Sequence, residues 1–372
     1  MAGKRLNNAD TPASLLIVPL VLLVAAVVGG CSSGSSTSEI SSHPSSASAN
    51  SNTTRFGAAE PAPLAASIAL AVYPSSTPAQ RPTAVTLVGE DWKNAVAAAV
   101  LMAPPIRAPL LISAASGTPG PSTRALETLN PQGQTLKRSG NRSRVGHPAY
   151  AIGPIATPTL SAARTAETSG APQAAEIEAL RVSIFREQPQ HVVVAPESDP
   201  AFAVPAAAWA ARSGDAVLYS RTDKLPAATA EALKSYPEVP VYVLGPSSAI
   251  SSGVVREIAK IDRHVKRVAG ETPAENAIAL ARYSDGSFGW NVNDRAHGFV
   301  IASSDAPLDA ALAAPLSASG KRGPLLLTEG PDRLPKAVRE YLLDVKPAHV
   351  WVIGDEEAID PSQQAEIDRL AG

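Results

Sequence analysis

Several groups of basic residues in this sequence could bind an anion. Four positive charges fall within eight residues that contain no acid, and two further groups follow: Lys137, Arg138, Arg142 and Arg144, then Arg263, Lys266 and Arg267, then Lys321 and Arg322. Arginine binds phosphate or carboxylate through paired hydrogen bonds, and lysine binds them as a point charge. The chain has a formal net charge of -2, so an anionic polymer would need such a local positive surface. A solvated surface loop is the alternative interpretation of the first group.

The residue patterns of common catalytic and cofactor sites are absent from the sequence. It contains no GxGxxG or GxxxxGK phosphate loop, no GxSxG nucleophile turn, no SxxK pair and no HExxH zinc motif. His191, His297 and His349 each precede an apolar run, but no cysteine lies near them, so we expect no metal site. The sequence therefore predicts a protein that is not an enzyme and holds no cofactor.

One short polar run follows a predicted strand at the position where open α/β sheets bind ligands. Ser303, Ser304 and Asp305 come directly after the apolar run 299–302. Serine and aspartate also begin helices by accepting hydrogen bonds from free backbone N–H groups. Both interpretations of these three residues stay open at the level of sequence.

The amino-terminal segment has the pattern of an export signal. Lys4 and Arg5 precede an apolar run of 14 residues, 15–28, which is short for a membrane span. Cys31, the only cysteine, follows two glycines at the end of this run, in a pattern that resembles a bacterial lipoprotein signal. That resemblance implies removal of residues 1–30 and a lipid-anchored Cys31. An ordinary signal peptide or single-span anchor is the alternative.

A serine-rich tract follows the signal, and the remainder alternates strands with helices. Residues 31–56 contain little apolar material, so we expect a flexible tether. Beyond them, Gly153, Gly245 and Gly354 each close a predicted strand, at spacings of 92 and 109 residues. This long period predicts three tandem doubly wound α/β modules with parallel sheets, over residues 57–164, 165–265 and 266–372.

The third module carries a family resemblance. The stretches "RVAGETPAENAIALA", "GPLLLTEGPDRLPKAVREYL" and "HVWVIGDEEAI" resemble the cell wall-binding type 2 repeat (CWB2) of bacterial surface proteins. The resemblance implies three Rossmann-like or flavodoxin-like modules packed around a pseudo-threefold axis. It also implies binding to an anionic secondary polymer of the cell wall, and it adds Asp309, from the family's Asp-Ala pair, to the candidate contacts. The pair is missing from the first two modules, and the family's usual residues after Gly270 are replaced by 273–276.

Together these features predict an exported lipoprotein on the cell membrane, facing the wall and binding its polymer without catalysis. Two alternatives stay open: a lipid-anchored protein that binds a small solute, and an interaction scaffold that has lost polymer binding. A deep apolar cleft would favour the first, and a shallow polar groove would favour the polymer. Nucleic acid is not an expected partner of an exported, slightly acidic chain without a nucleic-acid-binding motif.

Overall fold

The computed structural model describes residues 48–133, 135–138, 141–144, 146–156, 160–318, 320 and 322–372. They fall in the second of two units of the chain, Ser41–Gly372. Cys31, the apolar run before it and Lys321 lie outside the described residues, as do the side chains of Lys137, Arg138, Arg142 and Arg144. Among the helices of the described part, none has the length and apolar character to cross a membrane.

Three parallel sheets of four strands form the framework, which confirms the predicted α/β modules. The first two sheets have the strand order second, first, third, fourth along the chain, and in the third sheet a strand from the start of the described chain takes the fourth place. The first sheet contains β4 (Leu110–Ile112), β3 (Val85–Val88), β7 (Ala149–Ala151) and β8 (Ala162–Arg164), and the second contains β10 (Ala216–Ser220), β9 (Val192–Pro196), β11 (Val241–Leu244) and β12 (Val265–Val268). The third contains β14 (Leu325–Thr328), β13 (Gly298–Ser303), β15 (His349–Ile353) and β2 (Thr53–Phe56), with the short β1 (Ser48–Ala49) antiparallel to β2.

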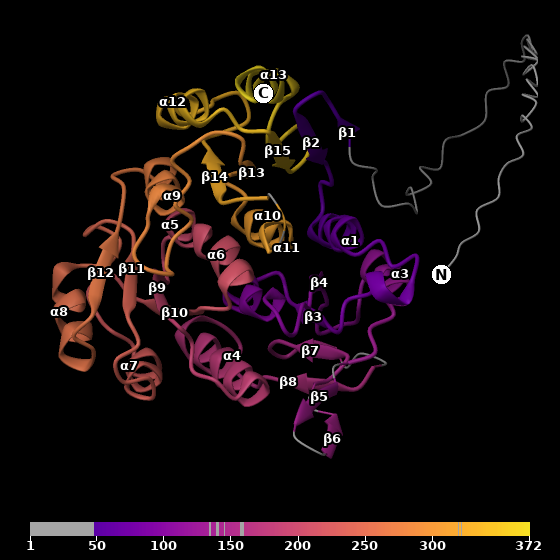
Figure 1. The fold of residues 1–372 in the computed structure, drawn as a ribbon, viewed down its shortest axis with the longest axis vertical. Helices are drawn as coiled ribbons and strands as arrows, with labels where there is room; N and C mark the ends of the chain where they lie inside the picture. Colours follow the sequence, from indigo (N-terminus) through magenta and orange to yellow (C-terminus); the bar gives the residue numbers. More distant parts are fainter. Residues whose placement is uncertain are drawn as a thin grey trace, which may run out of the picture. The chain divides into compact units, whose positions relative to one another are not determined.

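Helices cover the sheets because the central strands are buried along their whole length and expose no polar face. In the third sheet, α10 (Pro307–Leu312) and α11 (Ala314–Ser317) lie on one side, and α12 (Lys336–Val345) and α13 (Pro361–Leu370) lie on the other (Figure 1). The remaining helices are α1 (Pro61–Val72), α2 (Trp92–Ala98), α3 (Gly120–Leu129), α4 (Gly170–Phe185), α5 (Pro200–Ala203), α6 (Pro205–Ser213), α7 (Ala227–Lys234), α8 (Ser252–Ile261) and α9 (Pro273–Arg282), with 3-10 turns η1 (Pro78–Gln80) and η2 (Ala99–Met102).

The modules meet through the helices that follow their first strands. α2 with η2, α6, and α10 with α11 contact one another, and their facing residues are mostly buried alanines. Small side chains let these helices approach closely, so the apolar cores of the three modules join into one cluster. Many alanines of the sequence therefore lie where the modules contact one another.

The helix that follows the closing strand of each sheet packs on the next sheet. β8 closes the first sheet, but the helix after it, α4, packs on β10 of the second. In the same way β12 closes the second sheet while α9 packs on β14 of the third. β2 closes the third sheet by pairing with β15, and α1 then packs on β4 of the first. The strand nearest the chain's start therefore completes its last sheet.

This arrangement corrects two predicted boundaries. The tether was predicted to reach residue 56, but Thr53 to Phe56 form β2 in parallel with β15. The sequence of β2 is not a plain apolar run, because it includes the buried Arg55, which donates hydrogen bonds to the Gln364 side chain and to the carbonyl oxygen of Asp355. The predicted boundary after residue 265 falls inside β12, so residues 266–268 belong to the second sheet.

Candidate polymer-binding site

Three arginines occupy equivalent places on the fourth strands of the sheets. Arg55 donates to the carbonyl oxygens of Gly354 and Asp355, at 2.9 and 2.7 Å. Arg267 donates to those of Gly245 and Ile250, at 2.5 and 2.7 Å, and the exposed Arg164 donates at 3.3 Å to the carbonyl oxygen of a loop residue. Each side chain thus ties its strand to the loop after the third strand.

Arg267, predicted to bind polymer, therefore has donors committed to the protein's own backbone. Its burial lowers the pKa of the guanidinium, which is the expected cost of desolvating a cation without a carboxylate beside it. Gly245, whose carbonyl it binds, has a φ of 103°, and the chain turns away from β11 at this point. The hydrogen bonds of Arg267 therefore stabilise the turn after β11.

The other two members of its group have separate environments. Lys266 points to the opposite face of β12, because alternate residues of a strand face opposite ways, and its ammonium lies 2.5 Å from the Asp285 carboxylate. That carboxylate also accepts a hydrogen bond from the Tyr242 hydroxyl, at 2.7 Å. Arg263 is exposed in the loop before β12 and forms no ion pair within the described part of the chain. The three cations do not form one surface.

Asp309 lies in the first turn of α10, beside the carboxyl ends of the third sheet's strands. Its burial, with a smaller contribution from the nearby Asp355, raises the pKa of the Asp309 carboxyl to about 6. The loop next to it is held locally, since the Ser303 hydroxyl accepts a hydrogen bond from the Asp305 N–H at 3.2 Å. Ser303 thus holds a turn within the loop, and the N-cap residue of α10 is Ala306, which makes no side-chain capping bond.

Arg322 lies at the opposite, amino end of the same sheet. Its guanidinium carbon is 5.5 Å from the centre of the Trp351 ring, within the range of a cation–π contact. Burial lowers the pKa of Arg322, and among the described residues no carboxylate lies within ion-pair distance of it. Arg322 is therefore a partly desolvated cation that, among the described residues, contacts an aromatic face and forms no ion pair.

Two further side chains extend this surface along β15 and β2. The His349 ring is tilted against Trp351 at 4.8 Å between centroids, and its Nε2 lies 2.9 Å from the Thr54 hydroxyl. His349 and Trp351 are two residues apart and so face the same side of β15, and Thr54 is the register partner of Trp351. We call Arg322, Trp351, His349 and Thr54 the Arg322 surface.

Glycines explain how Arg322 reaches Trp351 across the intervening strand. Gly298, at the start of β13, is the register partner of His349 and carries no side chain to separate the two flanking strands. A Cβ on Gly323 would collide with the carbonyl oxygen of Gly298, so the backbones approach too closely for any larger residue. The two glycines and the spacing of His349 and Trp351 can be seen in the sequence. They indicate this surface only when the order of the strands is known.

The three histidines have separate partners. The Nδ1 of His191 lies 3.0 Å from the Asp215 carboxylate, and the Nε2 of His297 lies 2.7 Å from the carboxylate of Asp294. Within the described ranges, no three histidine, cysteine, aspartate or glutamate side chains are placed to hold a metal ion.

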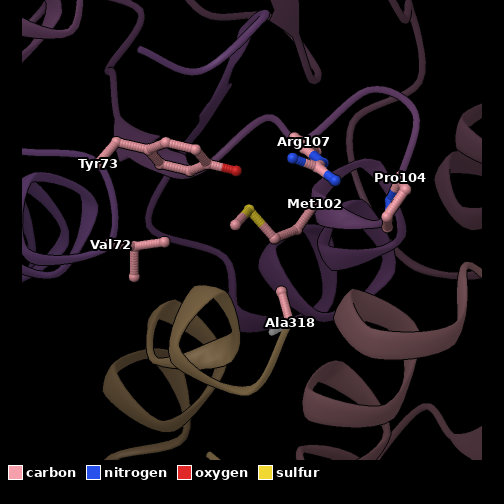
Figure 2. Close-up of a pocket in the computed structure, with 6 residues that line it drawn as sticks. All are labelled: Val72, Tyr73, Met102, Pro104, Arg107 and Ala318. Carbon is pink, nitrogen blue, oxygen red and sulfur yellow. The ribbon is translucent and has the colours of Figure 1, made fainter. Parts of the chain in front are cut away.

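A small cavity lies where the carboxyl ends of α1, η2 and α11 meet. It has a volume of about 160 Å³. In Figure 2 the Tyr73 hydroxyl, the Arg107 guanidinium and the Met102 sulfur point toward this space. Burial raises the pKa of Tyr73 to about 12, so its hydroxyl is a neutral donor at physiological pH. Ligand pockets for drug-sized molecules usually exceed about 300 Å³, so this one would admit only a few heavy atoms.

The fold and the Arg322 surface define a class of protein: tandem doubly wound modules with a cationic, aromatic surface on the third module. Residues 267–364, which contain Arg322, Trp351 and His349, match the family model of Cell wall binding domain 2 (CWB2). The third module is therefore similar to a CWB2 domain, as its sequence resemblance predicted.

Solved structures show the same fold. Cwp8 from Clostridium difficile matches with a TM-score of 0.65 at 20% identity, over 86% of this chain and 52% of that one. Cwp6 from Clostridium difficile matches with a TM-score of 0.68 at 18% identity, over 86% of this chain and 48% of that one. The chain thus spans about half the length of these two proteins. No curated protein matches the sequence.

Proposed function

We propose that this protein binds an anionic polymer of the bacterial cell wall, and that the Arg322 surface is the contact made by the third module. The observation that carries the proposal is the match of residues 267–364 to a cell wall binding domain. The physical support is that a partly buried arginine without a counterion gains most from an anionic ligand. The Trp351 ring beside it offers an apolar face to a sugar ring.

The remaining features of the proposal come from the amino-terminal sequence. We infer export by the signal at residues 1–30, lipid attachment at Cys31, and a tether that ends before β1 at Ser48. The lipid would hold one end of the chain in the membrane while the modules contact the wall. Attachment of this kind is a matter of binding, and it needs no catalytic step.

The cavity shown in Figure 2 is an observation that favours the small-solute alternative. Its volume of about 160 Å³ suits a ligand much smaller than most binding-protein substrates. The scaffold alternative is supported by Asn94 and Phe202, which stand at the positions of the first two modules that correspond to Asp309. Neither alternative accounts for the place of Arg322 beside Trp351.

Sedimentation with isolated cell walls tests the proposed function. The full chain is mixed with walls before and after acid extraction of their anionic polymers, at low and at high salt. Binding that disappears after extraction and weakens with salt is the expected result, because exposed charge pairs are screened. A chain that stays in the supernatant with untreated walls at low salt would overturn the proposal.

A further inference from the structure

Three residues from separate segments form a chain of hydrogen bonds at the amino ends of the second sheet's strands. The Ser287 hydroxyl oxygen lies 3.3 Å from Nε2 of His191, and Nδ1 of His191 lies 3.0 Å from the Asp215 carboxylate. His191 precedes β9, Asp215 precedes β10, and Ser287 lies in the loop after α9. A nucleophile, a base and a carboxylate in this order are the parts of an activated serine.

Asp215 holds the imidazole in one orientation. Its Oδ1 accepts a hydrogen bond from the backbone N–H of His191 at 3.0 Å. Its Oδ2 accepts from the Trp209 indole N–H at 2.9 Å as well as facing Nδ1 of the histidine. Because a carboxylate only accepts, it fixes the proton on Nδ1 and leaves Nε2 as the acceptor that faces Ser287. Asp215 is thus a positioning residue.

The turn that carries Ser287 is held by its neighbours. Asp285 and Phe288 exchange backbone hydrogen bonds across it, and the Phe288 ring stacks on Tyr242 at 3.6 Å between centroids. The edge of Phe288 also packs against the His191 ring, with centroids 5.4 Å apart. Packing that fixes Phe288 therefore fixes the adjacent serine relative to the histidine.

Asp215 and His191 are buried and Ser287 is exposed, which is the difference in exposure that a reactive serine requires. Asp215 and His191 are only 2% and 7% exposed, whereas Ser287 is exposed. In the described part of the chain, the backbone N–H groups of Ser287 and Gly289 donate to no protein acceptor, so both are available to an oxyanion. A base shielded from water and an accessible hydroxyl favour attack on a substrate that arrives from solution.

We propose that Ser287 is a nucleophile activated by His191, and that it cleaves esters of small acyl groups. The Ser287 oxygen forms a bond to the carbonyl carbon as its proton passes to Nε2 of His191. The ester C–O bond then breaks, and the leaving alkoxide takes that proton. Water, deprotonated by the same nitrogen, then attacks the acyl carbon. The bond from that carbon to the Ser287 oxygen breaks, this oxygen takes the proton from Nε2, and the acid is released. This activity goes beyond wall binding and beyond the prediction that the chain is not an enzyme, and it does not rest on the proposed function.

The first test uses a fluorophosphonate probe, which modifies activated serines, on the full chain. Mass spectrometry of the digest is expected to place the adduct on Ser287. The matched control is Ser284→Ala, which removes an exposed hydroxyl of the same loop. Labelling is expected to be unchanged in Ser284→Ala and lost in Ser287→Ala. An intact chain whose Ser287 reacts no faster than other exposed serines would overturn the proposal.

The second test measures turnover of p-nitrophenyl acetate by the same variants and by His191→Ala. Removing the base is expected to slow turnover by about 10²- to 10⁴-fold. Added imidazole is expected to restore part of the rate in His191→Ala, which a merely structural role of the ring would not allow. Because His191 is buried, its variant is checked for folding by circular dichroism. Hydrolysis by Ser287→Ala at the rate of the unaltered chain would contradict the assignment without bearing on wall binding.

Discussion

The two ends of the third sheet each hold an arginine, and the two arginines have different partners. At the carboxyl end, Arg55 is 5% exposed, donates to two loop carbonyls and the Gln364 side chain, and lies near the Asp355 carboxylate. At the amino end, Arg322 contacts the Trp351 ring and forms no ion pair in the described part of the chain. The first cation stabilises the fold, and the second is available to a ligand. The groups that surround each guanidinium therefore distinguish the structural arginine from the one that is available for binding.

Removing Arg55 should have the largest effect of the changes that test this comparison. Arg55→Ala leaves two backbone carbonyls and a glutamine oxygen without their donor, so we expect a loss of about 3 kcal/mol in the free energy of unfolding. Urea unfolding followed by circular dichroism measures it. Arg164→Ala removes a single 3.3 Å bond from an exposed residue and should cost less than about 0.5 kcal/mol. Equal losses in the two variants would show that Arg55 is not structural.

Asp309 offers a test by pH at the carboxyl end. Its folded-state pKa of about 6 lies above that of the unfolded chain, so the folded state binds the proton more tightly. Stability should therefore be greatest below the unfolded pKa and fall as the pH rises through 6. Asp309→Asn removes this penalty and should stabilise the protein at pH 8 by roughly 2 kcal/mol, with little change at pH 3. Thermal unfolding at both pH values checks this, and a destabilised variant at pH 8 would contradict the burial argument.

Trp351 tests the aromatic part of the amino-end surface. Trp351→Leu keeps an apolar residue on β15 but removes the flat ring, so binding to walls should weaken by roughly three- to tenfold. The matched control is Trp92→Leu in the first module, where Lys93 lies 5.2 Å from the ring centre. Sedimentation with walls should be unchanged for the control. If both variants weaken binding equally, the aromatic contact is not confined to the third module.

Lys266 should give the smallest effect. Its ammonium is already paired with Asp285, so Lys266→Gln should change wall binding by less than about twofold. The same sedimentation measurement tests this. A large loss would mean that the Lys266–Asp285 pair opens to the polymer, and it would place a contact on the second module.

The three α/β modules could be predicted from the sequence, but the strand that closes the third sheet could not. Buried runs such as 299–302 and the glycines that close the third strands define three modules, and the structure contains all three sheets. β2 was missed because its Thr-Thr-Arg-Phe sequence has no apolar period, and its partner β15 lies almost 300 residues away. Burial of Arg55 in that strand depends on carbonyls that only the folded loop supplies.

The candidate site could be predicted only in part. The sequence indicated Arg322 and Arg267 alike as cations that could bind polymer. Their different roles depend on the groups near each guanidinium, which are the Trp351 ring for Arg322 and two backbone carbonyls for Arg267. Trp351 was missed because it lies beside Arg322 only through the order of the strands in the sheet, and the sequence does not give this order. For the same reason a motif search finds no trace of Ser287, His191 and Asp215, whose hydrogen bonds join residues 96 and 24 positions apart.

The central claim is tested most directly by titrating acid-extracted anionic wall polymer into the full chain and into Arg322→Gln. The matched control is Arg333→Gln, which removes an exposed arginine of the same module. Loss of a charge-assisted contact of about 1.5–3 kcal/mol should weaken polymer binding by roughly 10- to 100-fold, while the control keeps the affinity of the unaltered chain. Equal affinity of Arg322→Gln and the unaltered chain would contradict polymer recognition by this surface.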